Sequence, residues 1–156
     1  MARILVIDDD QDYRNILRDF IEHRGHTVLE AESAAVGTDI FLREKIDLVV
    51  SDFMMPEKSG MELLSELKTI YPKVLFIMVT GFATMETAKE AIRLGAYDIL
   101  SKPVEMDQLS AVMQRALSTI ELQSNLSTVR GVNIALMLSI PLWLGLGYLL
   151  FRFFAR

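Results

Sequence analysis

The chain has 156 residues, which is enough for one domain of ordinary size and a short extension. It contains no cysteine, so disulfides and thiolate metal sites are excluded. All 21 acidic side chains, but only 13 of the 16 Lys and Arg side chains, fall within residues 1–129, which therefore carry a net charge of -8. Because this part has no basic stripe, nucleic acid is not an expected partner.

The first predicted strand covers residues 4–7, an apolar run that ends at adjacent aspartates. A helix follows, with Asp10 or Asp12 as its N-cap and Gly25 at its end. Its apolar side chains recur at the spacing of one helix face: Tyr13, Ile16, Leu17, Phe20 and Ile21.

The second predicted strand covers residues 27–31 and is less apolar than the others, as expected near the edge of a sheet. Ser33 is expected to cap a second helix that continues through Leu42. The third strand covers residues 46–51 and leads directly into Asp52.

Gly60 opens the third predicted helix, and Pro72 follows its end. The apolar face of this helix consists of Leu63, Leu64, Leu67 and Ile70. The fourth strand covers residues 74–80, so that Thr80 is its last residue.

Gly95 stops a fourth predicted helix, which spans about residues 84–94. The fifth strand covers residues 97–101 and leads directly into Lys102. The fifth helix is marked by apolar residues at helical spacing: Leu109, Val112, Met113, Ala116, Leu117 and Ile120.

Strand and helix signals therefore alternate five times, which predicts a single α/β domain of (βα)5 type at residues 1–120. Right-handed crossovers on both faces of a parallel sheet give a flavodoxin-like, doubly wound fold with strand order 2-1-3-4-5.

Residues 131–151 form a stretch of 21 residues without a formal charge. As a helix it would be about 31 Å long, matching a bilayer core of ~30 Å, and we expect a transmembrane helix. A buried core helix or a helix packed into an oligomer is the alternative. Residues 121–130 are expected to be a linker or an extension of the fifth helix, and residues 152–156 a short tail. Because no signal peptide is evident, the expected location is the inner (cytoplasmic) membrane, with the first domain in the cytosol.

Polar side chains stand where the predicted strands end, and the carboxyl ends of parallel strands line one crevice. The predicted order makes the first and third strands neighbours, so Asp8, Asp9 and Asp52 are expected to lie close together. Three close carboxylates repel one another, and a hard cation such as Mg²⁺ relieves that repulsion. Asp52 is the best-placed nucleophile toward phosphorus. Lys102 is suited to pair with phosphoryl oxygens, and Thr80 to donate a hydrogen bond to one of them.

Each of these residues also has an ordinary explanation. Aspartates after the first strand suit helix capping, Asp52 suits a turn, and Lys102 suits the start of a helix. Because the whole set stands in order at strand ends, we favour the functional interpretation. A nucleotide site is not expected, because no glycine-rich phosphate loop follows the first strand.

Four motifs together resemble the receiver domain of two-component response regulators. They are Ile-Leu-Val-Ile-Asp-Asp-Asp, Val-Val-Ser-Asp-Phe-Met-Met-Pro, Met-Val-Thr-Gly and Leu-Ser-Lys-Pro, and the resemblance covers about residues 3–120. It implies that Asp52 is the phosphoacceptor, that Thr80 is the switch hydroxyl and that Lys102 pairs with the phosphate.

The resemblance also implies a magnesium site. Its direct ligands would be Asp9, Asp52 and the backbone carbonyl of Met54, with Asp8 acting mainly through water.

One position departs from the pattern of the family. Receivers often carry Tyr or Phe three residues before the lysine, where this chain has Ile99. Tyr97 lies two residues earlier and is expected on the same face of the strand.

These features predict a membrane-tethered receiver that accepts a phosphoryl group from a sensor histidine kinase or a histidine phosphotransfer protein. It would act on an unknown downstream protein and would catalyse only its own phosphorylation and dephosphorylation. Two alternatives remain open: a Mg²⁺-dependent phosphohydrolase that works through an aspartyl-phosphate, and a non-signalling membrane scaffold.

Overall fold

The structure is a computed structural model that describes residues 1–81 and 84–119. Residues 1–117 form one compact unit in which strands and helices alternate. The strands are β1 (Arg3–Ile7), β2 (Thr27–Ala31), β3 (Leu48–Asp52), β4 (Phe76–Thr80) and β5 (Asp98–Ser101). The helices are α1 (Gln11–Glu22), α2 (Ala34–Arg43), α3 (Gly60–Ile70) and α4 (Met85–Leu94), and a further helix spans residues 106–119.

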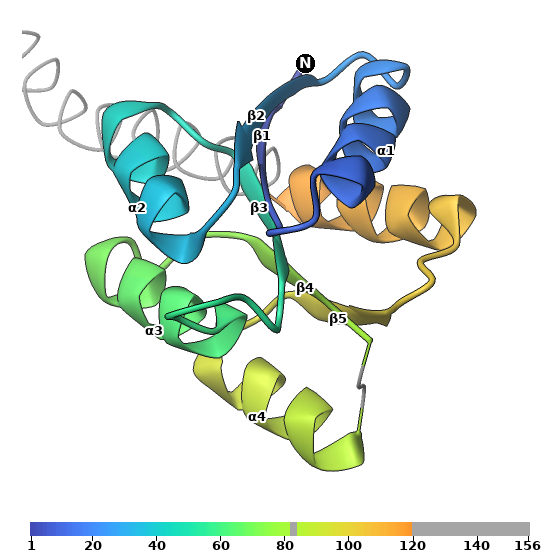
Figure 1. Cartoon of the computed structure of the whole chain (residues 1–156). Coiled ribbons are helices and arrows are strands. Elements are labelled where there is room, and N and C mark those ends of the chain that lie inside the picture. The colour runs from blue at the N-terminus through green and yellow to red at the C-terminus, as the bar shows by residue number, and fades with distance from the viewer. Residues whose placement is uncertain (82–83, 120–156) are drawn as a thin grey trace, which may run out of the picture. The chain divides into compact units, whose positions relative to one another are not determined.

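All five strands pair in parallel in the order β2-β1-β3-β4-β5, which confirms the predicted flavodoxin-like topology (Figure 1). β3 and β4 are buried along their whole length, whereas most of β2 is only half-buried, as expected at an edge. Ile7 pairs with Ser51, so the residues that follow β1 and β3 emerge together at the carboxyl edge of the sheet.

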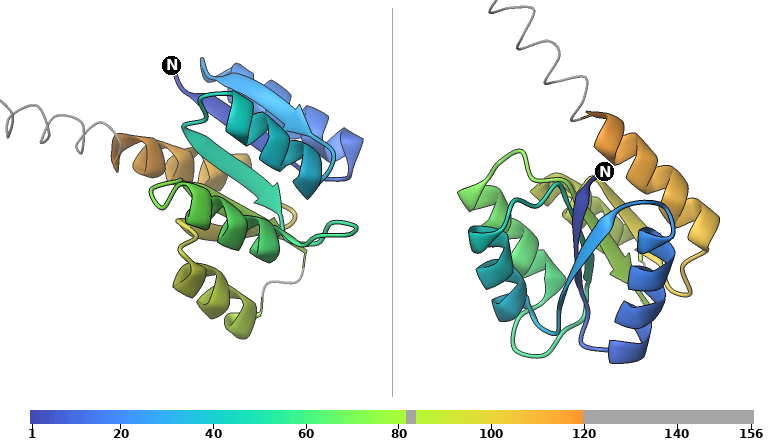
Figure 2. Two further views of the ribbon diagram at one scale, coloured as in Figure 1. Left: turned by 90° about the vertical axis from the view of Figure 1, so that its left-hand side faces the viewer. Right: turned by 90° about the horizontal axis from the view of Figure 1, so that it is seen from above.

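Helices cover both faces of the sheet, as Figure 2 shows from two directions. α1 and the 106–119 helix pack on one face, where Leu17 and Leu109 belong to one buried cluster with Val50 of β3. On the other face α2, α3 and α4 contribute to a second cluster, which contains Leu64 and Ala91. The strands therefore lie between two apolar layers, and their near-continuous apolar sequences follow from burial on both sides.

Polar caps fix where the helices begin. Asp10 rather than Asp12 caps α1, since its side chain accepts from two main-chain N–H groups of the first turn. Ser33 caps α2 as predicted, and Thr84 caps α4. α3 begins with a capping box, in which Ser59 and Glu62 satisfy each other's backbone donors.

Some apolar residues do not lie where the periodicity placed them. Ile16 of α1 is 52% exposed and Ile70 of α3 is 46% exposed, although both fall on the predicted apolar faces. A helical period marks the direction of an apolar face but not how wide a part of it the neighbouring elements cover. Val74 is buried but precedes β4: its N–H donates to the carbonyl of Tyr71 in the turn after α3.

Tyr97 and Ile99 pack on opposite faces of the sheet, so the expectation that they share a face is wrong. Tyr97 contacts the cluster beneath the 106–119 helix, whereas Ile99 contacts the cluster beneath α3 and α4. The reason is that β5 begins only at Asp98, so the two-residue alternation of a strand does not extend back to Tyr97.

Within residues 1–81 and 84–119, no helix combines the length and apolar character that a membrane crossing requires. The predicted transmembrane helix at residues 131–151, the linker at 121–130 and the tail at 152–156 lie outside the described residues.

Candidate functional site

The carboxyl edge of the sheet brings together the predicted acidic residues. Asp8 directly follows β1, and Asp52 is the last residue of β3, the neighbouring strand. Oxygen atoms of Asp8, Asp9 and Asp52 all lie within 4.8 Å of one another. The side chain of Asp8 is fully buried and that of Asp52 nearly so, whereas Asp9 is exposed. The carboxylates therefore form a pocket that is open to solvent on the side of Asp9.

This set of ligands fits a hard divalent cation. Carboxylate oxygens are the ligands that Mg²⁺ prefers, and an open side leaves room for the waters that Mg²⁺ retains. Three carboxylates within 4.8 Å also repel one another, and a bound cation relieves that repulsion. The pocket is therefore suited to Mg²⁺, with Asp8, Asp9 and Asp52 as the protein groups that would hold it.

The ammonium group of Lys102 enters the same pocket from the end of β5. Its Nζ lies 2.7 Å from Oδ2 of Asp8 and 3.0 Å from Oδ2 of Asp52. The backbone N–H of Lys102 donates to the carbonyl of Thr80, which ties the end of β5 to the end of β4, and a cis peptide bond joins Lys102 to Pro103. The lysine is thus placed where its single charge partly offsets those of the two buried carboxylates.

Burial and pairing act in opposite directions on these charges. Burial raises the pKa of Asp8 above its ordinary value, and the hydrogen bonds from Lys102 and from the backbone of Asp10 only partly oppose that rise. For Lys102, burial is the largest single influence and lowers the pKa, but the hydrogen bonds to Asp8 and Asp52 and the negative charges of these two residues together outweigh it and leave the pKa raised. Lys102 is therefore charged at neutral pH, and Asp8 carries a carboxylate that ionises at an energetic cost.

Thr80 and Met54 lie at the same edge of the sheet. Thr80 is the fully buried last residue of β4 and pairs with Ser101, while the residue before it, Val79, pairs with Asp52. Met54 follows β3 by two residues, and its side chain is mostly exposed. Their roles, as a switch hydroxyl and as a backbone carbonyl ligand, remain predictions.

The segment after Asp52 is held by backbone contacts. The N–H of Phe53 lies 2.8 Å from Oδ1 of Asp52, and the carbonyl of Phe53 accepts from the N–H of Gly60 at 2.9 Å. A Cβ atom on Gly60 would lie only 2.2 Å from the carbonyl oxygen of Asp52. Gly60 thus allows the start of α3 to pass directly against the end of β3, which the motif alone did not explain.

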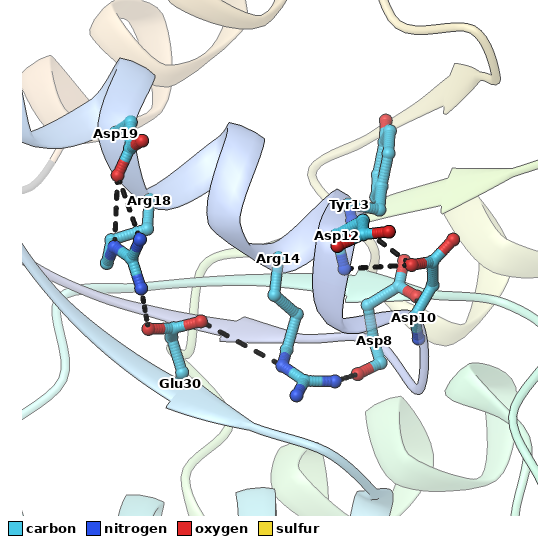
Figure 3. A network of polar contacts seen from close by, with 8 residues as sticks. All are labelled: Asp8, Asp10, Asp12, Tyr13, Arg14, Arg18, Asp19 and Glu30. Atoms are coloured by element: carbon cyan, nitrogen blue, oxygen red, sulfur yellow. Dashed lines mark hydrogen bonds and ion pairs between the residues drawn. The ribbon is translucent and has the colours of Figure 1, made fainter.

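A second group of charged residues supports the acidic pocket, and the sequence motifs did not reveal it. Figure 3 shows this network: Arg14 of α1 donates a hydrogen bond of 2.6 Å to the backbone carbonyl of Asp8. Its Nε lies 3.9 Å from Glu30 of β2, and Glu30 also pairs with Arg18 at 2.9 Å. An arginine within an otherwise apolar helix face was the signal in the sequence, because a buried guanidinium requires partners.

Lys102 also has an aromatic neighbour. Its Nζ lies 4.4 Å from the centre of the Tyr13 ring, within range of a cation–π contact. The sequence placed Tyr13 on the apolar face of its helix, and the structure agrees, since the ring also packs against the buried cluster of that face.

Comparison with known proteins agrees with this geometry. A family model of the response regulator receiver domain matches residues 4–114. The chain is 34% identical over 137 residues to the regulatory protein AtoC of Escherichia coli (strain K12), covering 88% of this chain and 29% of that protein. It is 38% identical over 118 residues to the transcriptional regulatory protein ZraR of Salmonella typhimurium, covering 74% of this chain and 26% of that protein. The chain thus spans less than a third of the length of these curated relatives.

Solved structures give the same result. A receiver domain protein from Clostridium thermocellum is 36% identical and superimposes with a TM-score of 0.76, covering 79% of this chain and 99% of that chain. NtrX from Brucella abortus is 34% identical with a TM-score of 0.77, covering 82% of this chain and 29% of that chain. Since the family model covers most of the chain, the protein belongs to the response regulator receiver family of two-component systems.

Proposed function

We propose that Asp52 accepts a phosphoryl group from the phosphohistidine of a sensor histidine kinase or a histidine phosphotransfer protein. The observation that supports this most directly is the position of the Lys102 ammonium, which contacts both Asp8 and Asp52 in one pocket. Phosphoryl oxygens are negatively charged, so the carboxylates of the pocket repel them and one ammonium group does not compensate. The pocket therefore suits a phosphoryl group only when a metal ion is also bound. Mg²⁺ held by Asp8, Asp9 and Asp52 would neutralise charge on the phosphoryl oxygens.

In the proposed step an Oδ atom of Asp52 attacks phosphorus, and the bond between phosphorus and the imidazole nitrogen breaks. The nitrogen leaves with the electron pair of that bond, and the product is an acyl phosphate on Asp52. Lys102 then pairs with phosphoryl oxygens in place of a carboxylate, and Thr80 donates its hydroxyl hydrogen to one of them. No other substrate is turned over in this proposal, so the domain catalyses only its own phosphorylation and dephosphorylation.

The proposed output requires a change in the protein. Phosphorylation would bias the region of α4, β5 and the 106–119 helix toward one of two arrangements, and this would alter binding to a downstream protein. The transcriptional regulators that the chain resembles are several times longer, so the output of this chain is not transferred from them.

We also propose that residues 131–151 anchor the chain in the cytoplasmic membrane, with residues 1–120 in the cytosol. The support is the sequence itself, since a run of 21 residues without formal charge is long enough to cross a bilayer. In this arrangement the receiver would act close to the membrane.

A phosphotransfer assay tests the central proposal. The full chain in detergent micelles is incubated with Mg²⁺ and acetyl phosphate, or with a phosphorylated histidine kinase. The expected product is an acid-stable, base-labile phosphoprotein, and Asp52→Asn is expected to abolish it. Asp47→Asn is a matched control, since Asp47 directly precedes β3 and therefore lies at the opposite end of this strand from Asp52. Labelling that survives in Asp52→Asn would remove Asp52 as the acceptor.

A further inference from the structure

The ring of Tyr13 packs against the ammonium group of Lys102. Nζ of Lys102 lies 4.4 Å from the ring centre, while the same atom contacts Asp8 and Asp52. The position of Tyr13 is fixed by helix capping, since its backbone N–H donates to Oδ1 of Asp10 at 3.2 Å. Among the described residues, the ammonium thus contacts two carboxylates and one aromatic face.

The ring, and not the hydroxyl group, accounts for this contact. The hydroxyl oxygen of Tyr13 is buried beside the backbone of Val104, without a well-formed hydrogen bond among the described residues. A buried hydroxyl without a good partner costs free energy, so the hydroxyl does not explain why Tyr13 stands here. What Tyr13 offers the pocket is the electron-rich face of its ring.

Metal binding would change the contacts of Lys102. The carboxylates that hold its ammonium, Asp8 and Asp52, are also the groups that would bind a divalent cation. A metal ion and an ammonium group compete for the same oxygens and repel each other at short range. A hydrated Mg²⁺ ion does not compete for the aromatic ring, because it takes oxygen ligands.

We propose that Tyr13 is a positioning residue for phosphoryl transfer and acts through Lys102. Its ring retains the ammonium at the pocket when the metal takes over the carboxylates, so that Lys102 is in place to pair with the phosphoryl oxygens on Asp52. This inference rests on the proposed function, because the phosphoryl group is the partner for which Lys102 is retained.

Tyr13→Leu removes the ring and keeps an apolar side chain of moderate size. Without the ring, the ammonium moves toward solvent once Mg²⁺ is bound. The affinity for beryllofluoride, a phosphoryl mimic, is then expected to fall by roughly 2- to 30-fold in the presence of Mg²⁺, the range of a single cation–π contact. The affinity for Mg²⁺ alone is not expected to fall, because the ring contacts the lysine and not the metal.

Three further variants separate positioning from general damage. Tyr13→Phe keeps the ring and is expected to restore beryllofluoride binding relative to Tyr13→Leu. Tyr71→Leu is a matched control at an exposed tyrosine that follows α3. In a Lys102→Met background, Tyr13→Leu is expected to cause little further loss, since the two residues act through one contact.

The measurements use the full chain in detergent micelles. Affinities come from NMR titrations with Mg²⁺ alone and with Mg²⁺ plus beryllofluoride. The spectra also report the contact directly, because ring currents are expected to shift the protons beside Nζ of Lys102 upfield in the unmodified chain and in Tyr13→Phe, but not in Tyr13→Leu.

Several results would overturn the proposal. These are equal beryllofluoride affinity in Tyr13→Leu and the unmodified chain, a parallel loss of Mg²⁺ affinity, or an undiminished effect of Tyr13→Leu in the Lys102→Met background. If the unmodified chain bound beryllofluoride normally in these cases, the proposed function would stand and only the role of Tyr13 would fall. If the unmodified chain bound no beryllofluoride and took up no phosphoryl group, both would fall.

Discussion

Nη1 of Arg14 lies 2.6 Å from the backbone carbonyl oxygen of Asp8 and donates a hydrogen bond to it. The contact links the first turns of α1 to the end of β1, where the acidic pocket begins. Arg14 is buried, and Glu30 on β2 provides a carboxylate near its other side. The backbone that carries Asp8 and Asp9 is therefore held by a charged group from outside the pocket.

Replacing Arg14 by Met should destabilise the protein by about 1.5–3 kcal/mol, since it removes a buried hydrogen bond from a charged donor. The change should also weaken Mg²⁺ binding, because the backbone after β1 is no longer fixed. Urea unfolding and Mg²⁺ titration measure the two effects. Arg93→Met is the control, since that side chain is largely exposed and should change stability by less than about 0.5 kcal/mol. Equal stability of the two variants would show that the contact to Asp8 has little energetic weight.

The raised pKa of Asp8 predicts a pH dependence of stability. Because burial raises the folded-state pKa above the unfolded value of 3.8, the native state binds more protons than the unfolded state between these two pKa values. The free energy of unfolding therefore falls as pH rises through this window, and it stays lower above it.

Asp8→Asn removes this loss of stability, because the amide does not ionise. In Mg²⁺-free buffer the variant should be more stable than the unmodified chain at neutral pH, and the difference should disappear toward pH 3.8. Mg²⁺ should stabilise the unmodified chain more than the variant, since it binds the ionised carboxylate. Urea unfolding across this pH range, with and without Mg²⁺, measures both effects. A variant that is less stable at neutral pH without Mg²⁺ would contradict the stated direction of the pKa shift.

Gly60→Ala adds only one methyl group but should destabilise the protein strongly. The added Cβ would lie 2.2 Å from the carbonyl oxygen of Asp52, so either α3 or the end of β3 must move. We expect the free energy of unfolding to fall by about 1–3 kcal/mol, the cost of overpacking a rigid site. Mg²⁺ binding should also weaken. Gly81→Ala serves as the control, since no atom of the described residues, apart from its neighbours in the chain, lies within 4 Å of the position of its Cβ. Similar unfolding curves for the two variants would argue against the close approach of Gly60 to β3.

The membrane proposal predicts the behaviour of the full chain in cell fractionation. The chain should sediment with membranes and resist extraction by high salt and alkaline carbonate. Replacing Leu144 with Lys places a charge near the middle of residues 131–151 and should cost about 2.5–3.5 kcal/mol of insertion free energy. Lys45→Leu, outside that segment, should leave fractionation unchanged. Recovery of the unmodified chain in the soluble fraction would contradict a membrane anchor.

The sequence predicted the order of the strands and the edge where polar residues gather, because both follow from short apolar runs and the rules of parallel sheets. It did not predict which members of an apolar pattern are buried. Ile16 and Ile70 satisfy the helical period but are about half exposed, because the packing of neighbouring elements, and not the period, decides how much of a helix face is covered.

Contacts between distant parts of the chain were also beyond the sequence pattern. The pairing of Lys102 with Asp8 was foreseen only as shared proximity to a phosphate, not as a direct contact. The hydrogen bond from Arg14 to a backbone carbonyl depends on the exact path of the turn after β1. Tyr97 was placed on the wrong face because the start of β5 is set by pairing with β4, which the local sequence does not reveal.

The contact between Asp8 and Lys102 joins residues that are 94 positions apart. During synthesis on a ribosome, the early acidic residues emerge long before the lysine that balances them. The pocket is therefore incomplete until β5 pairs with β4, and a fragment that ends before β5 would carry the carboxylates without their internal counterion.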